Sequence, residues 1–439
     1  MERKEYGLFT VITLIIGIVI GSGIFFKSDN ILVYTEGSIL KGVIIFAICS
    51  LGIVFGSLSI AVLAQRTKNA GGIVAYAEEF VSKKVACAFG WFQAFIYFPA
   101  ISSIIGWVFA IYFCMLFGIE STNINLLIIS SIAIILIYIL NSISANMGGQ
   151  LQNISTIIKL IPMVIIAFAG IFMSGNTEII FSSNTNISNS IGWLGAIAPV
   201  AFSYEGWIVS TSVSHEVKNS EKTLPFALVF SSIFILVIYV LYFVGISVLV
   251  GPETIIAVGD EHVNLAAQKV FGDYGAKIIV TFIVISVLGG LNGLVLGFIR
   301  VPYSLSTKNM FPASEKIAVI NEKFKTPLNS AIVAFVINIV WILINYVVQE
   351  KGLLPNSDIS EAPIVASYIL YIILYVTVII MYKKGNHNIS FVKGIIFPGL
   401  AIIGAIIIIS CGLVNPVISY YMIVCIAFML LSVLFMKNK

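Results

Sequence analysis

The chain has 439 residues, of which 59% are hydrophobic and only 10% charged, and its formal net charge is +4. Soluble domains carry about 25% charged residues, so this composition excludes a soluble enzyme, a secreted disulfide scaffold and a disordered protein. Apolar runs of roughly 20 residues recur, and in hydrocarbon such runs must be helices, because their backbone groups find no other partners. The sequence therefore predicts an all-α polytopic membrane protein.

Apolar runs between polar breaks predict twelve transmembrane helices. The third and the eighth run exceed the length that a bilayer needs and are expected to tilt or to project beyond it. The twelve spans are expected at residues 8–34, 39–64, 85–117, 124–143, 150–173, 192–215, 224–250, 275–305, 328–348, 362–382, 394–414 and 416–436.

The lysines and arginines predict the orientation of these spans. When loops alternate between the two sides of the membrane, eighteen of these residues fall on one side and five on the other, with Lys159 inside a span. Cytoplasmic loops carry the excess of positive charge, so both termini are expected in the cytoplasm. The minority side carries Lys27, Lys41, Lys269, Lys277 and Lys351.

The first span contains the sequence Gly-Ile-Val-Ile-Gly-Ser-Gly-Ile-Phe at residues 17–25. Two glycines around Ser22 weaken the helix in mid-membrane, since glycine costs about 1 kcal/mol in a helix interior. Taken alone, the motif also fits a small-residue face for helix packing. Irregular backbone at this depth is tolerated only where it lines a cavity or is buried in protein.

The sixth span contains Pro199, Glu205 and Gly206, and it follows the first span by five. Because five is odd, a second set of five spans would be inverted relative to the first. Interrupted helices at matching positions of two halves point to a transporter binding site. A broken helix offers N–H groups to a carboxylate at one end and carbonyls to an ammonium at the other, so two antiparallel breaks suit a zwitterionic amino acid.

Three polar regions remain to be interpreted along the chain. Residues 264–271, in the loop between spans seven and eight, fit either a short surface helix or a plain solvated loop. The histidines lie in separate polar loops, so neither a metal site nor a cofactor is expected. The five cysteines fall in or at the ends of apolar runs without C-x-x-C spacing and are interpreted as small buried hydrophobes.

Lys159 and Glu205 are the only charged residues predicted deep inside the spans. A charge at mid-bilayer costs at least ~2.5–3.5 kcal/mol and therefore marks function by default. Lys159 suits a fixed counter-ion, a proton carrier or a structural donor to the carbonyls of a broken helix. Glu205 suits a hydrogen bond to the unwound segment, a substrate contact or a pair with a cation.

Several motifs resemble the amino acid–polyamine–organocation transporter superfamily, in family order and over nearly the whole chain. The branch of L-type amino acid transporters and their bacterial relatives is the most similar. The motifs are the 17–25 segment, Asn-Ala-Gly-Gly-Ile-Val-Ala-Tyr at 69–76, Phe-Ser-Tyr-Glu-Gly-Trp at 202–207, His-Glu-Val-Lys-Asn-Ser-Glu-Lys-Thr-Leu-Pro at 215–225, and Leu-Asn-Gly with Arg-Val-Pro-Tyr-Ser-Leu-Ser-Thr-Lys-Asn-Met-Phe-Pro within 291–312. The resemblance implies a LeuT-type fold with broken helices 1 and 6, inverted repeats at 1–173 and 192–382, and peripheral helices at 394–439.

The same resemblance implies a substrate site. Phe202 matches the gating aromatic of the family, and Lys159 matches a lysine near the place where sodium-coupled relatives bind sodium. Glu205 is counted among the substrate-binding residues, although its role does not carry over from the family. Backbone N–H groups for the carboxylate are implied at Gly21, Ser22, Gly23 and Ile24, and carbonyls for the amino group near Ile18, Val19, Ala201 and Phe202.

The resemblance implies a secondary transporter that moves amino acids across the cell (inner) membrane of a bacterium. Alternating access without sodium is expected, as an exchanger or a proton-coupled permease, and an amine or polyamine carrier of the same fold is the alternative. An enzyme and an ion channel are disfavoured, because the spans show no nucleophile–base pair and no selectivity-filter pattern. Small-molecule substrates and the lipid bilayer are the expected partners, and nucleic acid is not. No disulfide-linked heavy chain is expected, because the loop at 117–124 has no cysteine and Cys114 lies within span three.

Overall fold

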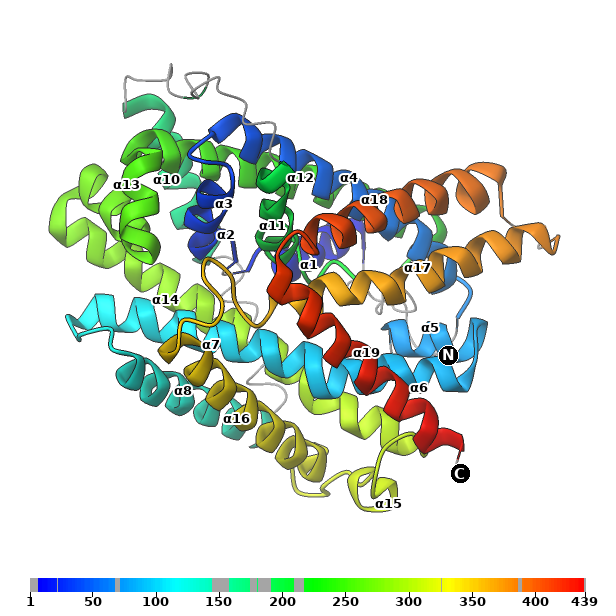
Figure 1. Ribbon diagram of the computed structural model, residues 1–439. Coiled ribbons are helices and arrows are strands. Elements are labelled where there is room, and N and C mark those ends of the chain that lie inside the picture. The colour runs from blue at the N-terminus through cyan, green and yellow to red at the C-terminus, as the bar shows by residue number, and fades with distance from the viewer. Residues whose placement is uncertain are drawn as a thin grey trace.

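The computed structural model describes residues 7–21, 23–67, 72–143, 158–173, 180, 191–208, 217–324, 326–385 and 389–437. The elements found in this part of the chain are helices (Figure 1). The longer helices are α1 (Leu8–Val19), α4 (Ile39–Ala64), α6 (Lys83–Phe92), α7 (Phe98–Phe117), α8 (Asn123–Ile143), α10 (Leu160–Met173), α12 (Ser220–Val250), α14 (His262–Thr307), α16 (Leu328–Glu350), α17 (Glu361–Lys383), α18 (Phe397–Gly412) and α19 (Pro416–Lys437). The shorter ones are α2 (Gly23–Phe26), α3 (Ser28–Tyr34), α5 (Gly72–Phe80), η1 (Gln93–Tyr97), η3 (Ile191–Ala196), α11 (Ile197–Ser203), α13 (Pro252–Val258), η5 (Gly259–Glu261), α15 (Ser314–Ile317) and η6 (Val392–Ile396).

Nine helical segments of the described chain are long and apolar enough to cross a membrane. They comprise α4, α8, α12, α16, α17 and α19, together with the continuous runs 83–117, 252–307 and 392–412. Three shorter apolar helices, Leu8–Gly17, Leu160–Met173 and Gly192–Ser203, lie within predicted spans one, five and six. The structure thus agrees with an all-α polytopic membrane protein, while the count of twelve spans stays a prediction.

The long helices pack in two groups. In one group α7, α8, α14 and α16 contact one another, and in the other α4 contacts α12, α17 and α18 (Figure 1). Buried amides connect the first group, since Asn141 Nδ2 donates to Asn292 Oδ1 at 2.8 Å and Asn338 Nδ2 donates to Ser103 Oγ at 3.0 Å. Such polar contacts hold helices together where apolar surface alone gives little preference for protein over lipid.

The second group surrounds the short helices. α1 packs against α12, and α11 packs against α4, α17 and α18. α10 approaches α12 so closely that a Cβ atom at Gly245 would lie 2.6 Å from the carbonyl oxygen of Ala167. Only glycine fits such a backbone contact. This contact fixes the position of α10, and Lys159 lies immediately before the first residue of α10.

A helix ends inside both the first and the sixth predicted span. α1 ends at Val19, and Ile20 has an extended conformation with φ −69° and ψ 92°. The helix resumes as α2 at Gly23, so the break falls on the glycine-rich motif of the first span. In the sixth span α11 ends at Ser203, and residues 204–208 form turns.

The loop before the eighth span is helical. α14 begins at His262, and Gly272, with φ 64° and ψ −174°, separates residues 262–271 from the rest of that helix. Of the two alternatives for residues 264–271, the short helix is therefore confirmed. His262 is fully buried, and its expected place in a polar loop is wrong, because the helix turns its side chain into the protein. All five cysteines are free and buried, as predicted.

Candidate functional site

The two helix breaks lie against each other. α2 contacts α11, and a Cβ atom built on Gly23 would lie 2.8 Å from Phe202 Cδ1 and 3.0 Å from Ser203 Cα. No side chain larger than that of glycine fits between the start of α2 and the end of α11. Ile24 and Ala201, on the same two short helices, are also buried. The structure thus brings together the expected site residues of the first and sixth spans.

Tyr239 joins the ends of the two broken helices. Its hydroxyl oxygen lies 3.1 Å from the carbonyl oxygen of Val19 and 2.7 Å from that of Ser203, and the hydroxyl donates to these acceptors. The side chain comes from α12 and is fully buried. Sequence reasoning missed this residue, although a tyrosine in the middle of an apolar span signals a hydroxyl that needs a buried partner.

Lys159 lies beside the last turn of α1. Its side chain is 2% exposed, and its ammonium group donates to the carbonyl oxygen of Gly17. Within the described residues no carboxylate lies at ion-pair distance from it. The carboxyl end of a helix carries partial negative charge, so the end of α1 stabilises this ammonium. Of the three roles considered for Lys159, the donor to broken-helix carbonyls matches this contact.

Glu205 follows α11 in the turn of the sixth span. Its Oε1 accepts a hydrogen bond of 2.5 Å from the hydroxyl of Tyr97, the last residue of the π-helical η1. Its Oε2 is buried and has no hydrogen-bond partner among the described residues. The ring of Trp207 contacts the edge of Tyr371 at 5.4 Å between centroids. Glu205 therefore offers one unpartnered acceptor oxygen within the protein interior.

Phe202 forms a layer with Phe26 and Lys27. The rings of Phe26 and Phe202 are 5.4 Å apart at 74°, an edge-to-face contact. The ammonium nitrogen of Lys27 lies 5.2 Å from the centroid of Phe202, within the range of a cation–π contact. Phe202 is 5% exposed. The aromatic layer covers the break at Gly23 and is an arrangement suited to a gate.

Lys27 is a buried charge that the sequence analysis did not expect. The ammonium group lies 2.8 Å from Asp358 Oδ2 and 2.5 Å from Glu361 Oε1, and Lys27 and Glu361 are both fully buried. The sequence analysis counted Lys27 with the loop lysines of the minority side, and the structure instead buries it within the protein. A buried charge is stable when it is paired. The two partners of Lys27 lie more than 330 residues away in the sequence, so no local pattern reveals them. The position of Lys27 directly after Ile-Phe-Phe was the available signal.

Three expected site residues remain, namely Ile18, Gly21 and Ser22. Gly21 is partly buried, and Ile18 belongs to the last turns of α1. Ser22 lies outside the described residues. In the described part of the chain no three His, Cys, Asp or Glu side chains come close enough to hold a metal ion.

One family model and three relatives are similar to this chain. The family model described as "Amino acid permease" matches residues 6–437. The serine/threonine exchanger SteT of Bacillus subtilis (strain 168) is 31% identical over 431 residues, which cover 95% of this chain and 93% of that protein. The cystine/glutamate transporter of Homo sapiens is 28% identical over 75% of this chain and 66% of its own length. The b(0,+)-type amino acid transporter 1 of Mus musculus is 27% identical over 78% of this chain and 70% of its own length.

Proposed function

Since this chain belongs to the amino acid permease family, we propose that it exchanges amino acids across a bacterial plasma membrane by alternating access and without sodium. The relatives are amino acid transporters or exchangers, so the chain is an amino acid transporter and not an enzyme. Serine and threonine are the first substrates to test, because SteT is a serine/threonine exchanger. The observation that carries the proposal is the contact between the two breaks at Gly23 and Phe202.

The proposed substrate site uses backbone groups from both breaks. N–H groups of the 21–24 segment bind the substrate carboxylate, because an unwound helix start leaves such donors without partners. Carbonyls near Val19, Phe202 and their neighbours bind the ammonium group. The support is that α1 ends at Val19, that α2 begins at Gly23, and that α11 ends beside them.

Lys159 replaces a sodium ion in this proposal. A sodium ion would satisfy carbonyl oxygens at the end of a broken helix, and the Lys159 ammonium already donates to the carbonyl of Gly17. A charged lysine in this position makes exchange independent of both sodium and a proton gradient. If the lysine instead releases its proton during the cycle, uptake follows a proton gradient, which is the proton-coupled form of the proposal.

The test of the function uses the purified protein in liposomes loaded with unlabelled serine. We expect uptake of external labelled serine or threonine that requires the internal amino acid and persists when choline replaces sodium. Strict sodium dependence would overturn the role of Lys159. Failure of a panel of amino acids to enter, with or without internal partner, would overturn amino acid exchange itself.

An amine or polyamine carrier is the second candidate, and one observation favours it. Glu205 Oε2 is buried without a hydrogen-bond partner in the described part of the chain, so it is available to a second ammonium group. Competition by amino acid methyl esters separates the two candidates. An amine carrier accepts the esters as well as free amino acids, whereas the proposed clamp requires a free carboxylate.

The orientation and the repeat are part of the proposal. Both termini are assigned to the cytoplasm from the eighteen-to-five charge distribution. Residues 1–173 and 192–382 are proposed as inverted repeats, with 394–439 peripheral, and the chain works without a disulfide-linked heavy chain, because Cys114 is buried within α7. A C-terminal tag that is accessible on intact cells would overturn the orientation.

A further inference from the structure

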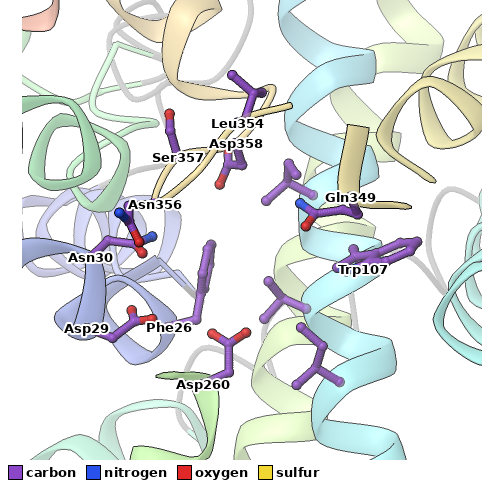
Figure 2. A pocket seen from close by; sticks show the side chains of 13 residues that line it. Phe26, Asp29, Asn30, Trp107, Asp260, Gln349, Leu354, Asn356, Ser357 and Asp358 are labelled. Carbon is purple, nitrogen blue, oxygen red and sulfur yellow. The ribbon is translucent and has the colours of Figure 1, made fainter. Parts of the chain in front are cut away.

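A cavity lies next to the aromatic layer of the gate. It has a volume of about 230 Å³, and Phe26 lines it, whereas Phe202, which contacts Phe26, does not. The cavity walls come from α3, α7, the end of α16 and the 354–358 segment, with Asp260 of η5 (Figure 2). On the proposed orientation these segments face the outside. The cavity therefore adjoins the outer side of the gate.

The cavity carries more negative than positive charge. Asp29, Asp260 and Asp358 line it, and Figure 2 shows the carboxylates of Asp29 and Asp260 pointing toward the same space beside Phe26. Asp358 is already paired with Lys27. Asp29 and Asp260 have no ion-pair partner among the described residues. Two neighbouring carboxylates repel each other when both are ionised, so the pair favours a positively charged ligand between them.

Buried polar atoms without hydrogen-bond partners also support a ligand in this cavity. Asp29 Oδ1 is buried and accepts no hydrogen bond from the described residues. The hydroxyl of Tyr112 is also buried without a partner in that part of the chain, and it lies within electrostatic range of Asp29 and Asp260. Tyr112 itself is fully buried. Buried polar groups normally have hydrogen-bond partners, so Asp29 Oδ1, which belongs to a residue that lines the cavity, is available to a bound group.

The shape and the remaining walls identify the class of cation. In the described part of the chain no group of three or more His, Cys, Asp or Glu side chains could hold a metal ion. The aromatic rings of Phe26 and Trp107 line the cavity and favour an organic ammonium. Asn30, Gln349 and Asn356 add amide groups, which can donate hydrogen bonds to a carboxylate. An amino acid of small size meets all of these conditions.

We propose that this cavity, which Asp29 and Asp260 make acidic, is an outer binding site for the primary ammonium group of an incoming amino acid. The inference rests on the proposed function in one respect, namely that the ligand comes to the protein as a substrate. The ammonium binds between Asp29 and Asp260 before the gate at Phe202 opens. The surplus of negative charge disfavours amino acids with acidic side chains. Lys27 offsets this effect only in part, because its ammonium group is paired with Asp358 and Glu361.

Binding at the outer site can be measured without transport. The chain has five tryptophans, and fluorine NMR of protein labelled with 5-fluorotryptophan resolves Trp107 by comparison with Trp107→Phe. The probe is ethanolammonium, which has an ammonium group but no carboxylate for the central clamp. We expect a saturable shift of the Trp107 signal, with a midpoint about tenfold higher in Asp29→Asn/Asp260→Asn. The matched control is Glu253→Gln, an exposed carboxylate on α13, which should leave the midpoint unchanged.

The outcomes separate the outer site from the proposed function. The outer site is overturned if ethanolammonium gives no saturable shift, if the double variant keeps the midpoint, or if calcium ions shift the signal and ethanolammonium does not. If the double variant does not fold, the single variant Asp260→Asn replaces it. Transport then gives a second readout, in which the external KM should rise about three- to tenfold at low ionic strength with the maximal rate retained. A protein that shifts with ethanolammonium but transports no amino acid would overturn the proposed function and leave the ammonium site standing.

Discussion

Two lysines in this protein are buried to nearly the same degree and are stabilised in different ways. Lys27 is 0% and Lys159 is 2% exposed. Lys27 lies between two carboxylates, those of Asp358 and Glu361. Lys159 donates to the backbone carbonyl of Gly17 and has no carboxylate at ion-pair distance in the described chain. The same side chain therefore meets full charges near the outer cavity and the end of a helix dipole at the break.

The ion pairs of Lys27 are therefore a fixed connection, whereas the contacts at the helix break can be exchanged for contacts to substrate. The Lys27 pairs connect the first span to the start of α17, and breaking such a buried pair strands charges in the interior. The contacts at the break consist of carbonyls with an ammonium or a hydroxyl, and a carbonyl oxygen has two lone pairs. Substrate groups can therefore join or replace these contacts at small cost. The ion pairs of Lys27 hold the structure together, and the break is suited to binding and release.

The largest effect is expected when Lys27 loses its charge. Lys27→Met leaves Asp358 and Glu361 buried without a cation and should destabilise the protein by about 3–5 kcal/mol. Thermal unfolding in detergent measures this loss. The exposed Lys351→Met is the matched control and should change little. The triple change Lys27→Met/Asp358→Asn/Glu361→Gln should recover most of the stability, and a failure to recover it would contradict the ion-pair explanation.

Gly23→Val should abolish amino acid binding while the protein stays folded in the membrane. The new side chain meets Phe202 and Ser203 at the point where the two breaks touch, where only glycine fits without a shift of its neighbours. Binding of labelled serine to purified protein measures the effect. Gly399→Val is the control, because a Cβ atom there has open space around it. Normal affinity in Gly23→Val would mean that the segment is an ordinary packed helix.

Lys159→Ala should reduce transport strongly and stability moderately. The carbonyl of Gly17 loses its donor, which costs about 1–3 kcal/mol, less than the loss expected for Lys27→Met. Exchange in liposomes and thermal unfolding, measured on the same preparations, test both parts. An equal loss of stability in Lys159→Ala and Lys27→Met would remove the distinction between the two lysines, and unchanged exchange would remove the functional role of Lys159.

Phe202→Ala should slow exchange more than it weakens binding, because the backbone site persists while the contact with Phe26 is lost. The exchange rate and the affinity for labelled serine are measured on one preparation. The test is whether the exchange rate falls by a larger factor than the affinity. A parallel fall of both quantities would make Phe202 a substrate contact and not a gate.

The sequence predicted the two helix breaks better than the ion pairs of Lys27, for a physical reason. The breaks depend on local features, namely the glycines around Ser22 and the Pro199–Gly206 segment, and local features are visible in one sequence. Lys159 stood out because its surroundings are apolar. The partners of Lys27 lie just before α17 and at its first residue, far along the chain, so only the fold brings them together. The buried position of Tyr239 signals that its hydroxyl needs a partner, but only the fold shows that the partners are the carbonyls of Val19 and Ser203.

The smallest expected effect concerns Tyr239, and it tests the central region most finely. Tyr239→Phe removes the hydroxyl that donates to the carbonyl oxygens of Val19 and Ser203 and leaves the ring in place. A hydrogen bond of this kind contributes about 1 kcal/mol, so the melting temperature should fall slightly and exchange should slow, since the two helix ends are held together less firmly. Tyr242→Phe is the matched control, because Tyr242 lies on the same helix, is also fully buried, and has a hydroxyl without a partner among the described residues. Removing that hydroxyl should be neutral or stabilising, since an unpartnered polar group costs free energy in the interior. If the two variants lose equal stability and activity, the hydroxyl of Tyr239 does not join the breaks, and the central region depends on the packing of rings and not on exchangeable contacts to carbonyls.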